Sequence, residues 1–206
     1  MFKNRENIKV CFAAVFAMGF FVSFLVMCNL GTDPCTFMNR SISSRIGLSF
    51  GNWQLLLNCL LFIIVFIKAK ELIGFGTIFN MVLVGYYVDF FTYLWGKIIP
   101  SFVWTNTFSK WLIYIITLFC FIVSAAVYIN SDTGVAPYDA LPIIITNIAE
   151  EKTGKSLKVA VRMCWDASAI IVGMLFGAMP VIGVILMTTF LGPVIGIVGR
   201  IMKNEG

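Results

Sequence analysis

Long apolar stretches alternate with short polar ones along this chain of 206 residues. A bilayer core about 30 Å thick needs roughly 20 mainly apolar residues for each helix that crosses it. Six stretches meet this need, and the last two are separated by a Gly- and Pro-containing break; they occupy residues 10–30, 51–67, 72–95, 111–130, 159–177 and 180–199. The pattern predicts an all-α membrane protein with six transmembrane helices in a single membrane domain, residues 1–206.

Glycines and prolines recur in the two halves of the chain. A G-x-x-P element occurs in Leu30-Gly31-Thr32-Asp33-Pro34 and again in Thr133-Gly134-Val135-Ala136-Pro137. Further pairs follow at one common spacing: Gly47 with Gly154, Ser49 with Ser156, Gly76 with Gly183, and Gly85 with Gly192. A unit of three spans is odd, so its second copy enters the bilayer from the opposite side. We therefore expect two inverted three-helix repeats, about 8–97 and about 110–200.

The segments after the two G-x-x-P elements are too short to span a membrane. Pro34 and Pro137 suit the first turn of a helix, and Asp33 suits the N-cap of the first one. Such a helix either re-enters the bilayer, with its positive N-terminal end facing a cavity, or lies at the interface as an amphipathic connector. We expect a short interfacial or re-entrant segment in each repeat, and of the two we favour the connector.

Composition and charge support the membrane assignment and indicate an orientation. Apolar residues make up 60% of the chain and charged residues 12%, which is outside the range of soluble domains. Lys and Arg are in excess on the side that holds the N-terminus, with Lys3, Arg5, Lys9, Lys68, Lys70, Lys152, Lys155, Lys158, Arg200 and Lys203 against Arg40, Arg45, Lys97 and Lys110. Because such an excess marks the cytoplasmic side, we expect both termini to be cytoplasmic. No basic stripe with interleaved aromatics occurs, so no nucleic-acid partner is expected.

Ionisable residues inside apolar spans are the clearest candidates for chemistry, because a charge there is costly unless it is paired or hydrated. Arg162 and Asp166 lie four residues apart on the fifth span and share one helical face. Asp166 is deeper and needs Arg162, a donor such as Asn58, or a proton, so it is the candidate for proton coupling; a static ion pair is the alternative. At the repeat spacing, Arg162 corresponds to Leu55 and Asp166 to Cys59. A working site would therefore be asymmetric and would depend mainly on the second repeat.

Three further aspartates are candidates for the lining of a path. Asp89 lies toward the outer end of the third span, where it either pairs with Lys97 or faces the mouth of a path. Asp33 precedes its proline and Asp139 follows its own, and the predicted topology places them on opposite sides of the membrane. They either line opposite vestibules or cap helices, and of the two we favour capping.

The sequence offers no support for enzymatic activity, a metal site or a cofactor. His is absent, and the six cysteines have no metal-type spacing. The run Thr153-Gly154-Lys155-Ser156 ends like a phosphate-binding loop, but Ala149 stands where the upstream glycine is required. No nucleophile–base pair is recognisable either.

Several short motifs together resemble the YczE/YitT-like family of bacterial polytopic membrane proteins. They are Leu30-Gly31-x-Asp33-Pro34, Ser49-Phe50-Gly51, Ile73-Gly74-x-Gly76-Thr77 with Gly85 and Asp89, Gly134-x-x-Pro137-x-Asp139, Thr153-Gly154-x-Ser156 and Arg162-x-x-x-Asp166. Gly183-Val184 departs from the Gly-Thr that the family pattern suggests. The resemblance implies a multi-pass protein of the bacterial cytoplasmic membrane, in a family sometimes suspected of transport.

Two functions remain open. The leading one is a secondary transporter or channel for a small solute or ion, with a path between the repeats. The residues expected along that path are Asp166, Arg162, Asn58, Asp89, Asp33, Pro34, Gly134, Pro137 and Asp139. The alternative is a non-transporting accessory or regulatory protein for a partner complex. Expected partners are the lipid bilayer and a small solute or proton; a homo-oligomer is compatible with the sequence, but nothing in the sequence supports one.

Overall fold

The computed structural model describes residues 5–154 and 156–204, which form helices without strands. Lys3 and Lys155 lie outside this described part of the chain, and so do the surroundings of Gly192 and the side chain of Lys203. The helices, in chain order, are α1 (Arg5–Cys28), α2 (Pro34–Ile46), α3 (Phe50–Lys68), the 3₁₀ turn η1 (Lys70–Leu72), α4 (Phe75–Ile98), α5 (Ser101–Thr105), α6 (Thr107–Asn130), α7 (Pro137–Thr153), α8 (Lys158–Leu175) and α9 (Ile182–Asn204).

The prediction of an all-helical membrane protein is confirmed, and the long helices follow the six apolar stretches of the sequence. Within the described residues, four helices, α1, α3, α4 and α6, are long and apolar enough to cross a membrane. Helix α8 differs from these because it carries Lys158, Arg162 and Asp166 within its 18 residues. Charges in an apolar helix have to face a partner or water, so the surroundings of Arg162 and Asp166 are described with the candidate site below.

Helices α1 and α6 pack against each other at the centre, and each also packs against one more long helix, α4 and α9 respectively. Buried side chains of these helices, such as Leu25, Phe121 and Met187, form the largest apolar cluster within the described residues. The short helices pack across the two halves of the chain. Helix α2 of the first half lies against α8 of the second half, and α7 of the second half lies against α3 of the first half.

The two G-x-x-P loops dock onto helix starts in the same way. Gly31 has φ +122° and Gly134 has φ +108°, in the region that favours glycine. The Leu30 carbonyl accepts a hydrogen bond from the Gly183 N–H at 3.0 Å, and the Thr133 carbonyl accepts one from the Gly76 N–H at 2.8 Å. A Cβ at Gly31 would lie 2.6 Å from the backbone nitrogen of Val184, and one at Gly134 would crowd the backbone of Gly74. Both loops therefore require glycine for conformation and for close contact.

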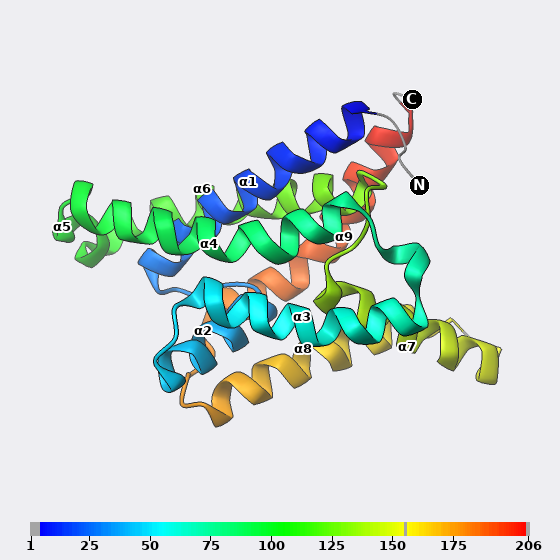
Figure 1. Ribbon diagram of the computed structural model, residues 1–206. Coiled ribbons are helices and arrows are strands. Elements are labelled where there is room, and N and C mark those ends of the chain that lie inside the picture. The colour runs from blue at the N-terminus through cyan, green and yellow to red at the C-terminus, as the bar shows by residue number, and fades with distance from the viewer. Residues whose placement is uncertain (1–4, 155, 205–206) are drawn as a thin grey trace.

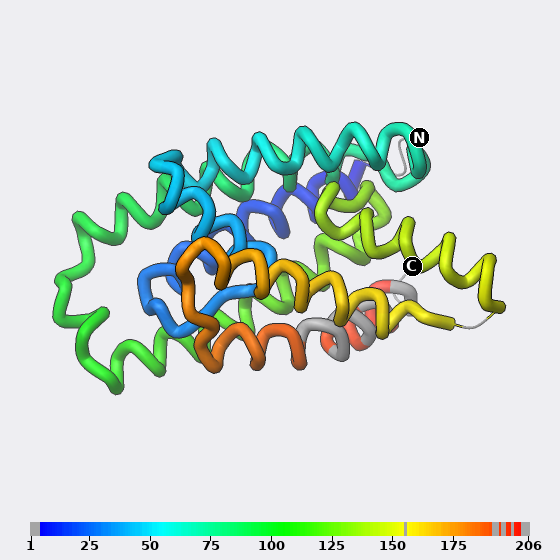
Figure 2. Tube along the Cα trace, turned by 90° about the horizontal axis from the view of Figure 1, so that it is seen from below, coloured from blue at the N-terminus to red at the C-terminus, as the bar shows by residue number. Residues whose placement is uncertain are grey.

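Helices α2 and α7 begin near the middle of the molecule and run toward its opposite ends (Figures 1 and 2). Pro34 and Pro137 occupy their first turns, as predicted, and both are buried. A connector lying on the surface, which we favoured from the sequence, would not begin inside the bundle. The polar composition of α2 misled that expectation, because its polar side chains find internal partners.

Hydrogen bonds to neighbouring helices satisfy the polar face of α2. The Ser41 hydroxyl donates to the Gly173 carbonyl at 2.7 Å, and Arg40 donates to the Val26 carbonyl at 3.3 Å. The Asn39 side-chain oxygen accepts from the indole N–H of Trp53 at 3.0 Å. Buried polar groups are tolerated when they are paired in this way, so a polar sequence does not by itself place a helix at the surface.

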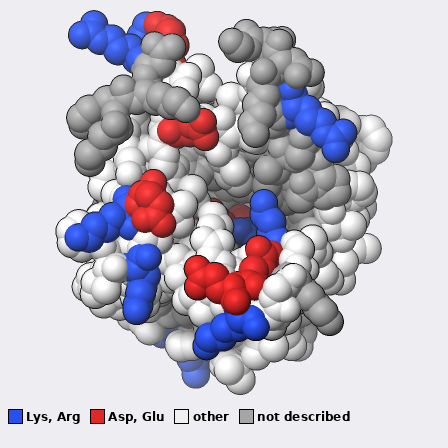
Figure 3. Space-filling model, turned by 90° about the vertical axis from the view of Figure 1, so that its right-hand side faces the viewer, with Lys and Arg blue, Asp and Glu red and all other residues white. Residues whose placement is uncertain are grey.

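Helix α1 begins and α9 ends at the same end of the molecule (Figure 1). Viewed from that end, Lys, Arg, Asp and Glu side chains surround a hollow in which charged atoms are visible (Figure 3). The end of α3, η1 and the last turn of α7 contribute charges there, among them Lys68, Glu71 and Lys152. The opposite ends of the long helices carry fewer charges, which matches the asymmetry counted in the sequence.

Candidate functional site

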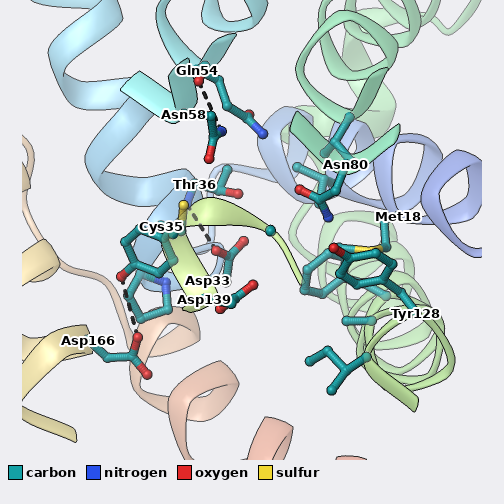
Figure 4. Close-up of a pocket in the computed structure, with 18 of the residues that line it drawn as sticks. Met18, Asp33, Cys35, Thr36, Gln54, Asn58, Asn80, Tyr128, Asp139 and Asp166 are labelled. Carbon is teal, nitrogen blue, oxygen red and sulfur yellow. Dashed lines mark hydrogen bonds between the residues drawn. The ribbon is translucent and has the colours of Figure 1, made fainter. Parts of the chain in front are cut away.

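A cavity of about 80 Å³ lies where the starts of α2 and α7 converge (Figure 4). Its lining combines apolar residues of α1, α4 and α6 with polar residues from α2, α3, α4, α7 and α8. One water needs roughly 10–15 Å³ of such space, so the cavity has room for a few waters or a small hydrated ion. It is the place in the described structure where ionisable residues of both halves meet.

One side of the cavity is formed by an ion-paired group on α7 and α8. Nη1 of Arg162 donates to Oδ1 of Asp139 at 2.8 Å, and Nε donates to Oδ2 of Asp166 at 3.0 Å. The Tyr138 hydroxyl donates to the other oxygen of Asp166 at 3.4 Å. Asp166 is only 5% exposed, yet both of its oxygens have donors. Such satisfaction is what a buried ion pair needs, and it binds α7 to α8.

Asp33 lies in the same cavity but has no cationic partner among the described residues. Its Oδ1 accepts the Thr36 N–H at 3.0 Å, so Asp33 is the N-cap of α2, as predicted. Its Oδ2 is buried and has no hydrogen-bond partner within the described chain. A buried polar atom without a partner is costly. Oδ2 therefore carries a desolvation cost that no hydrogen bond offsets, whereas Oδ1 has a donor.

Side-chain amides form the wall opposite the ion-paired group. Gln54 and Asn58 come from α3, and Asn80 comes from α4. The Asn58 side-chain nitrogen donates to the backbone carbonyl of Gln54 at 3.0 Å. Its Oδ1 is buried and has no partner within the described residues. In Figure 4, Asn58 and Asn80 point into the space that Asp33 and Asp139 also face.

The structure brings most of the expected path residues together. Those that line the cavity are Asp33, Pro34, Asn58, Asp139, Arg162 and Asp166. Gly134 and Pro137 shape the loop and the first turn of α7 without lining the cavity. Asp89 lies elsewhere, with Oδ2 accepting the Gly51 N–H at 2.8 Å. The expected partner of Asp89, Lys97, instead lies over the ring of Tyr93, 4.4 Å from its centroid, so Asp89 joins α3 to α4.

Two expectations about individual residues need correction. Asp33 and Asp139 do not face opposite vestibules: both line one cavity, because α2 and α7 both start inside the bundle. Asn58 does not donate to Asp166; its side-chain nitrogen is used by Gln54, and Tyr138 supplies the second donor to Asp166.

Sequence reasoning also missed several lining residues, including Gln54, Asn80, Tyr138, Cys35, Thr36 and Tyr128. A signal existed for Gln54, since it lies four residues before Asn58 in an apolar span and shares its helical face. No comparable signal marked Tyr138, because its role follows from the packing of α7 against α8.

These apolar helices, with charges gathered at a central cavity, define a multi-pass membrane protein. The chain matches the Family of unknown function (DUF6198) over residues 6–200, and it belongs to that family. It is 29% identical over 147 residues to the "Uncharacterized membrane protein YczE" of Bacillus subtilis (strain 168), covering 69% of this chain and 62% of that protein. The predicted YczE-like membership is thus confirmed.

Two further proteins are similar to this chain, and their descriptions state neither a location nor a role. An "Uncharacterized protein" of Haemophilus influenzae (strain ATCC 51907 / DSM 11121 / KW20 / Rd) is 23% identical over 190 residues, covering 92% of this chain and 82% of that protein. The "Uncharacterized protein YyaS" of Bacillus subtilis (strain 168) is 27% identical over 133 residues, covering 63% of each chain. No solved structure matches the chain.

Proposed function

We propose that this protein is a secondary transporter or channel for a small solute or ion, with a path through the central cavity. The observation that carries the proposal is the convergence of two oppositely directed short helices on one cavity that holds three aspartates and an arginine. Helix starts that meet inside a bundle, beside ionisable side chains, are typical of transport sites. A purely structural bundle has no need of this arrangement.

We further propose that the chain is built from two inverted repeats of three spans each. Equivalent hydrogen bonds from the two G-x-x-P loops to the starts of α9 and α4 support this. The packing supports it too, since α1 with α4 matches α6 with α9, and α2 with α8 matches α7 with α3. Helix α8 would be a span whose Arg162 and Asp166 face the cavity, because beyond the exposed Lys158 at its start it exposes large apolar side chains: Val159, Met163, Ile171, Met174 and Leu175.

The proposed location is the bacterial cytoplasmic membrane, with both termini on the cytoplasmic side. Support comes from the excess of Lys and Arg at the end where α1 begins and α9 ends, since that excess marks the cytoplasmic face. The hollow visible at this end (Figure 3) would then open toward the cytoplasm. The proposed partners are the lipid bilayer and the transported solute, and the proposal includes no catalytic step.

A second candidate is a non-transporting accessory or regulatory membrane protein. It is favoured by the complete pairing of Asp166, which has a donor on each oxygen. A group so well satisfied can serve as a fixed link between α7 and α8. Transport remains the better supported function, because this link does not involve Asp33 or Asn58. Each of these two residues has a buried oxygen without a hydrogen-bond partner in the same cavity, within the described residues.

Flux measurements in proteoliposomes test the proposal. Wild-type protein should move at least one member of a panel of amino acids, organic ions, metal ions and protons. Asp139→Asn and Arg162→Gln should reduce that flux at least tenfold, because they alter the charge that faces the path. Asp89→Asn is the matched control, since Asp89 lies outside the cavity, and it should keep the wild-type rate. A panel without flux, or equal rates in all the variants, would favour the accessory function.

A further inference from the structure

We infer that Asp33 and Asn58 form a binding site for a small monovalent cation in the central cavity. The inference rests on the proposed function, since it names the class of ion that the path would hold. It differs from the sequence-based expectation, which assigned coupling to Asp166.

The charges around the cavity leave a deficit that one monovalent cation would neutralise. Three carboxylates and one guanidinium line it, which leaves two negative charges when all are ionised. Each helix N-terminus acts as about half a positive charge, and α2 and α7 both start there. About one negative charge therefore remains.

Asp33 is the cavity carboxylate that has no cationic partner within the described residues. Asp139 and Asp166 share the guanidinium of Arg162, at 2.8 and 3.0 Å. Asp33 instead accepts the Thr36 N–H at Oδ1, and its Oδ2 has no hydrogen-bond partner within the described residues. A carboxylate oxygen buried in this way requires a cation or a proton, and the cavity beside it has room for a cation.

A second, independent oxygen points to the same ligand. Asn58 is 3% exposed, its Oδ1 has no partner in the described chain, and it comes from a different helix, α3. Figure 4 shows Asn58 and Asp33 turned toward the same space. Both residues line the same cavity, so we place the ion between them, with water completing the contacts that the protein oxygens leave open. One cation would thus satisfy both oxygens.

The ligand atoms favour a hard, singly charged ion. Carboxylate and amide oxygens bind hard cations rather than soft metals. Divalent sites commonly gather several acidic ligands, and no group of three or more His, Cys, Asp or Glu close enough to hold a metal occurs within residues 5–154 and 156–204. One free carboxylate with neutral amides suits an alkali ion or ammonium better.

Thermal unfolding of the purified protein in detergent tests the site without requiring transport. Melting would be followed from 0 to 300 mM of sodium, potassium, lithium or ammonium chloride, with choline chloride keeping the ionic strength constant. The wild type should be stabilised by at least one of these small cations over choline, because a ligand that binds only the folded state raises the melting temperature. The order of the cations identifies the preferred one.

Two variants localise the effect, and one controls for it. Asp33→Asn keeps the N-cap, because Asn caps as well as Asp, and should raise the half-saturating cation concentration at least tenfold. Asn58→Leu, close in size, should raise it severalfold. Asp89→Asn should match the wild type. Equal cation dependence in Asp33→Asn and wild type would overturn the site. A wild type that is stabilised by a change of pH but by none of the four small cations would also overturn it.

The two proposals fail separately. A protein that binds the cation through Asp33 but shows no flux in proteoliposomes retains the site and loses the transport function. A protein that moves a solute at the same rate in sodium, potassium, lithium, ammonium and choline retains the function and loses the cation site.

Discussion

The two G-x-x-P loops share a backbone design and differ in their charges. In each, a glycine with positive φ docks onto the first turn of a long helix from the other half of the chain. Asp33 precedes its proline and keeps one oxygen without a partner in the described structure. Asp139 follows its proline and pairs with Arg162. The comparison teaches that the backbone frame is repeated, whereas the chemistry is distributed unequally within it.

This difference suggests a division of roles in the cavity. The Asp139–Arg162–Asp166 group links α7 and α8, and both of its carboxylates pair directly with the guanidinium. Asp33, at the start of α2, is available to a ligand. Substitutions that disturb the shared frame should affect both loops alike, while substitutions of charged residues should affect only one side.

The largest expected effect comes from the loop glycines. Gly31→Ala and Gly134→Ala should each destabilise the protein by about 2–5 kcal/mol, because a left-handed conformation costs about 1–2 kcal/mol and crowding adds about 1–3 kcal/mol. Gly47→Ala is the matched control, since Gly47 has φ +75° but open space around it, and it should cost only the conformational part. Melting temperatures in detergent provide the measurement. A large loss at one loop and none at the other would show that the two loops are not equivalent.

The next effect concerns the link between α7 and α8. Arg162→Gln should destabilise by about 2–4 kcal/mol, because it leaves two carboxylates without their cation. Lys9→Gln breaks the exposed pair of Lys9 with Glu6, at 2.8 Å, and should cost less than about 0.5 kcal/mol. The two variants would be compared by thermal unfolding at the same pH and salt. Equal, small losses would mean that the Arg162 group does not hold the helices together.

A smaller effect should come from the hydroxyl that donates to Asp166. Tyr138→Phe removes this donor, whose oxygen lies 3.4 Å from Oδ1 of Asp166, and should cost about 1 kcal/mol. In the double variant Tyr138→Phe with Asp166→Asn, the losses should not add, because the two residues share one interaction. Additive losses in unfolding experiments would contradict the contact.

The smallest effects separate the two roles of Asp33. Asp33→Ala removes the cap of α2 and should cost about 1 kcal/mol. Asp33→Asn keeps a capping oxygen and should change stability by less than about 0.5 kcal/mol in choline chloride. Unfolding curves of the two variants, recorded without small cations, provide the comparison. An equal loss in both would mean that the charge, and not the cap, stabilises α2.

Much of the fold was predictable because apolar length and small-residue spacing are local signals. The six apolar stretches became α1, α3, α4, α6, α8 and α9, and Pro34 and Pro137 began helices as expected. The placement of α2 was not predictable, because burial of a polar helix depends on partners distant in sequence, such as the Gly173 carbonyl for Ser41.

The candidate site was predictable only in part for the same reason. The pair of Arg162 with Asp166 follows from spacing along one helix, and it was expected. The contact of Arg162 with Asp139 joins residues 23 apart in sequence, and it depends on how α7 packs against α8. The meeting of Asp33 with Asp139 depends on both short helices starting inside the bundle, which no local pattern indicates.

Access of water to the cavity from both sides of the membrane is the central claim, and labelling of Cys35 tests it most directly. Cys35 lines the cavity, whereas Cys28 is buried outside it. Two variants that retain only Cys35 or only Cys28 would be placed in sealed vesicles of each orientation and treated with a membrane-impermeant thiol reagent. The account predicts that Cys35 is labelled from both sides and Cys28 from neither. Absence of Cys35 labelling from either side in intact vesicles, with full labelling after denaturation, would contradict it.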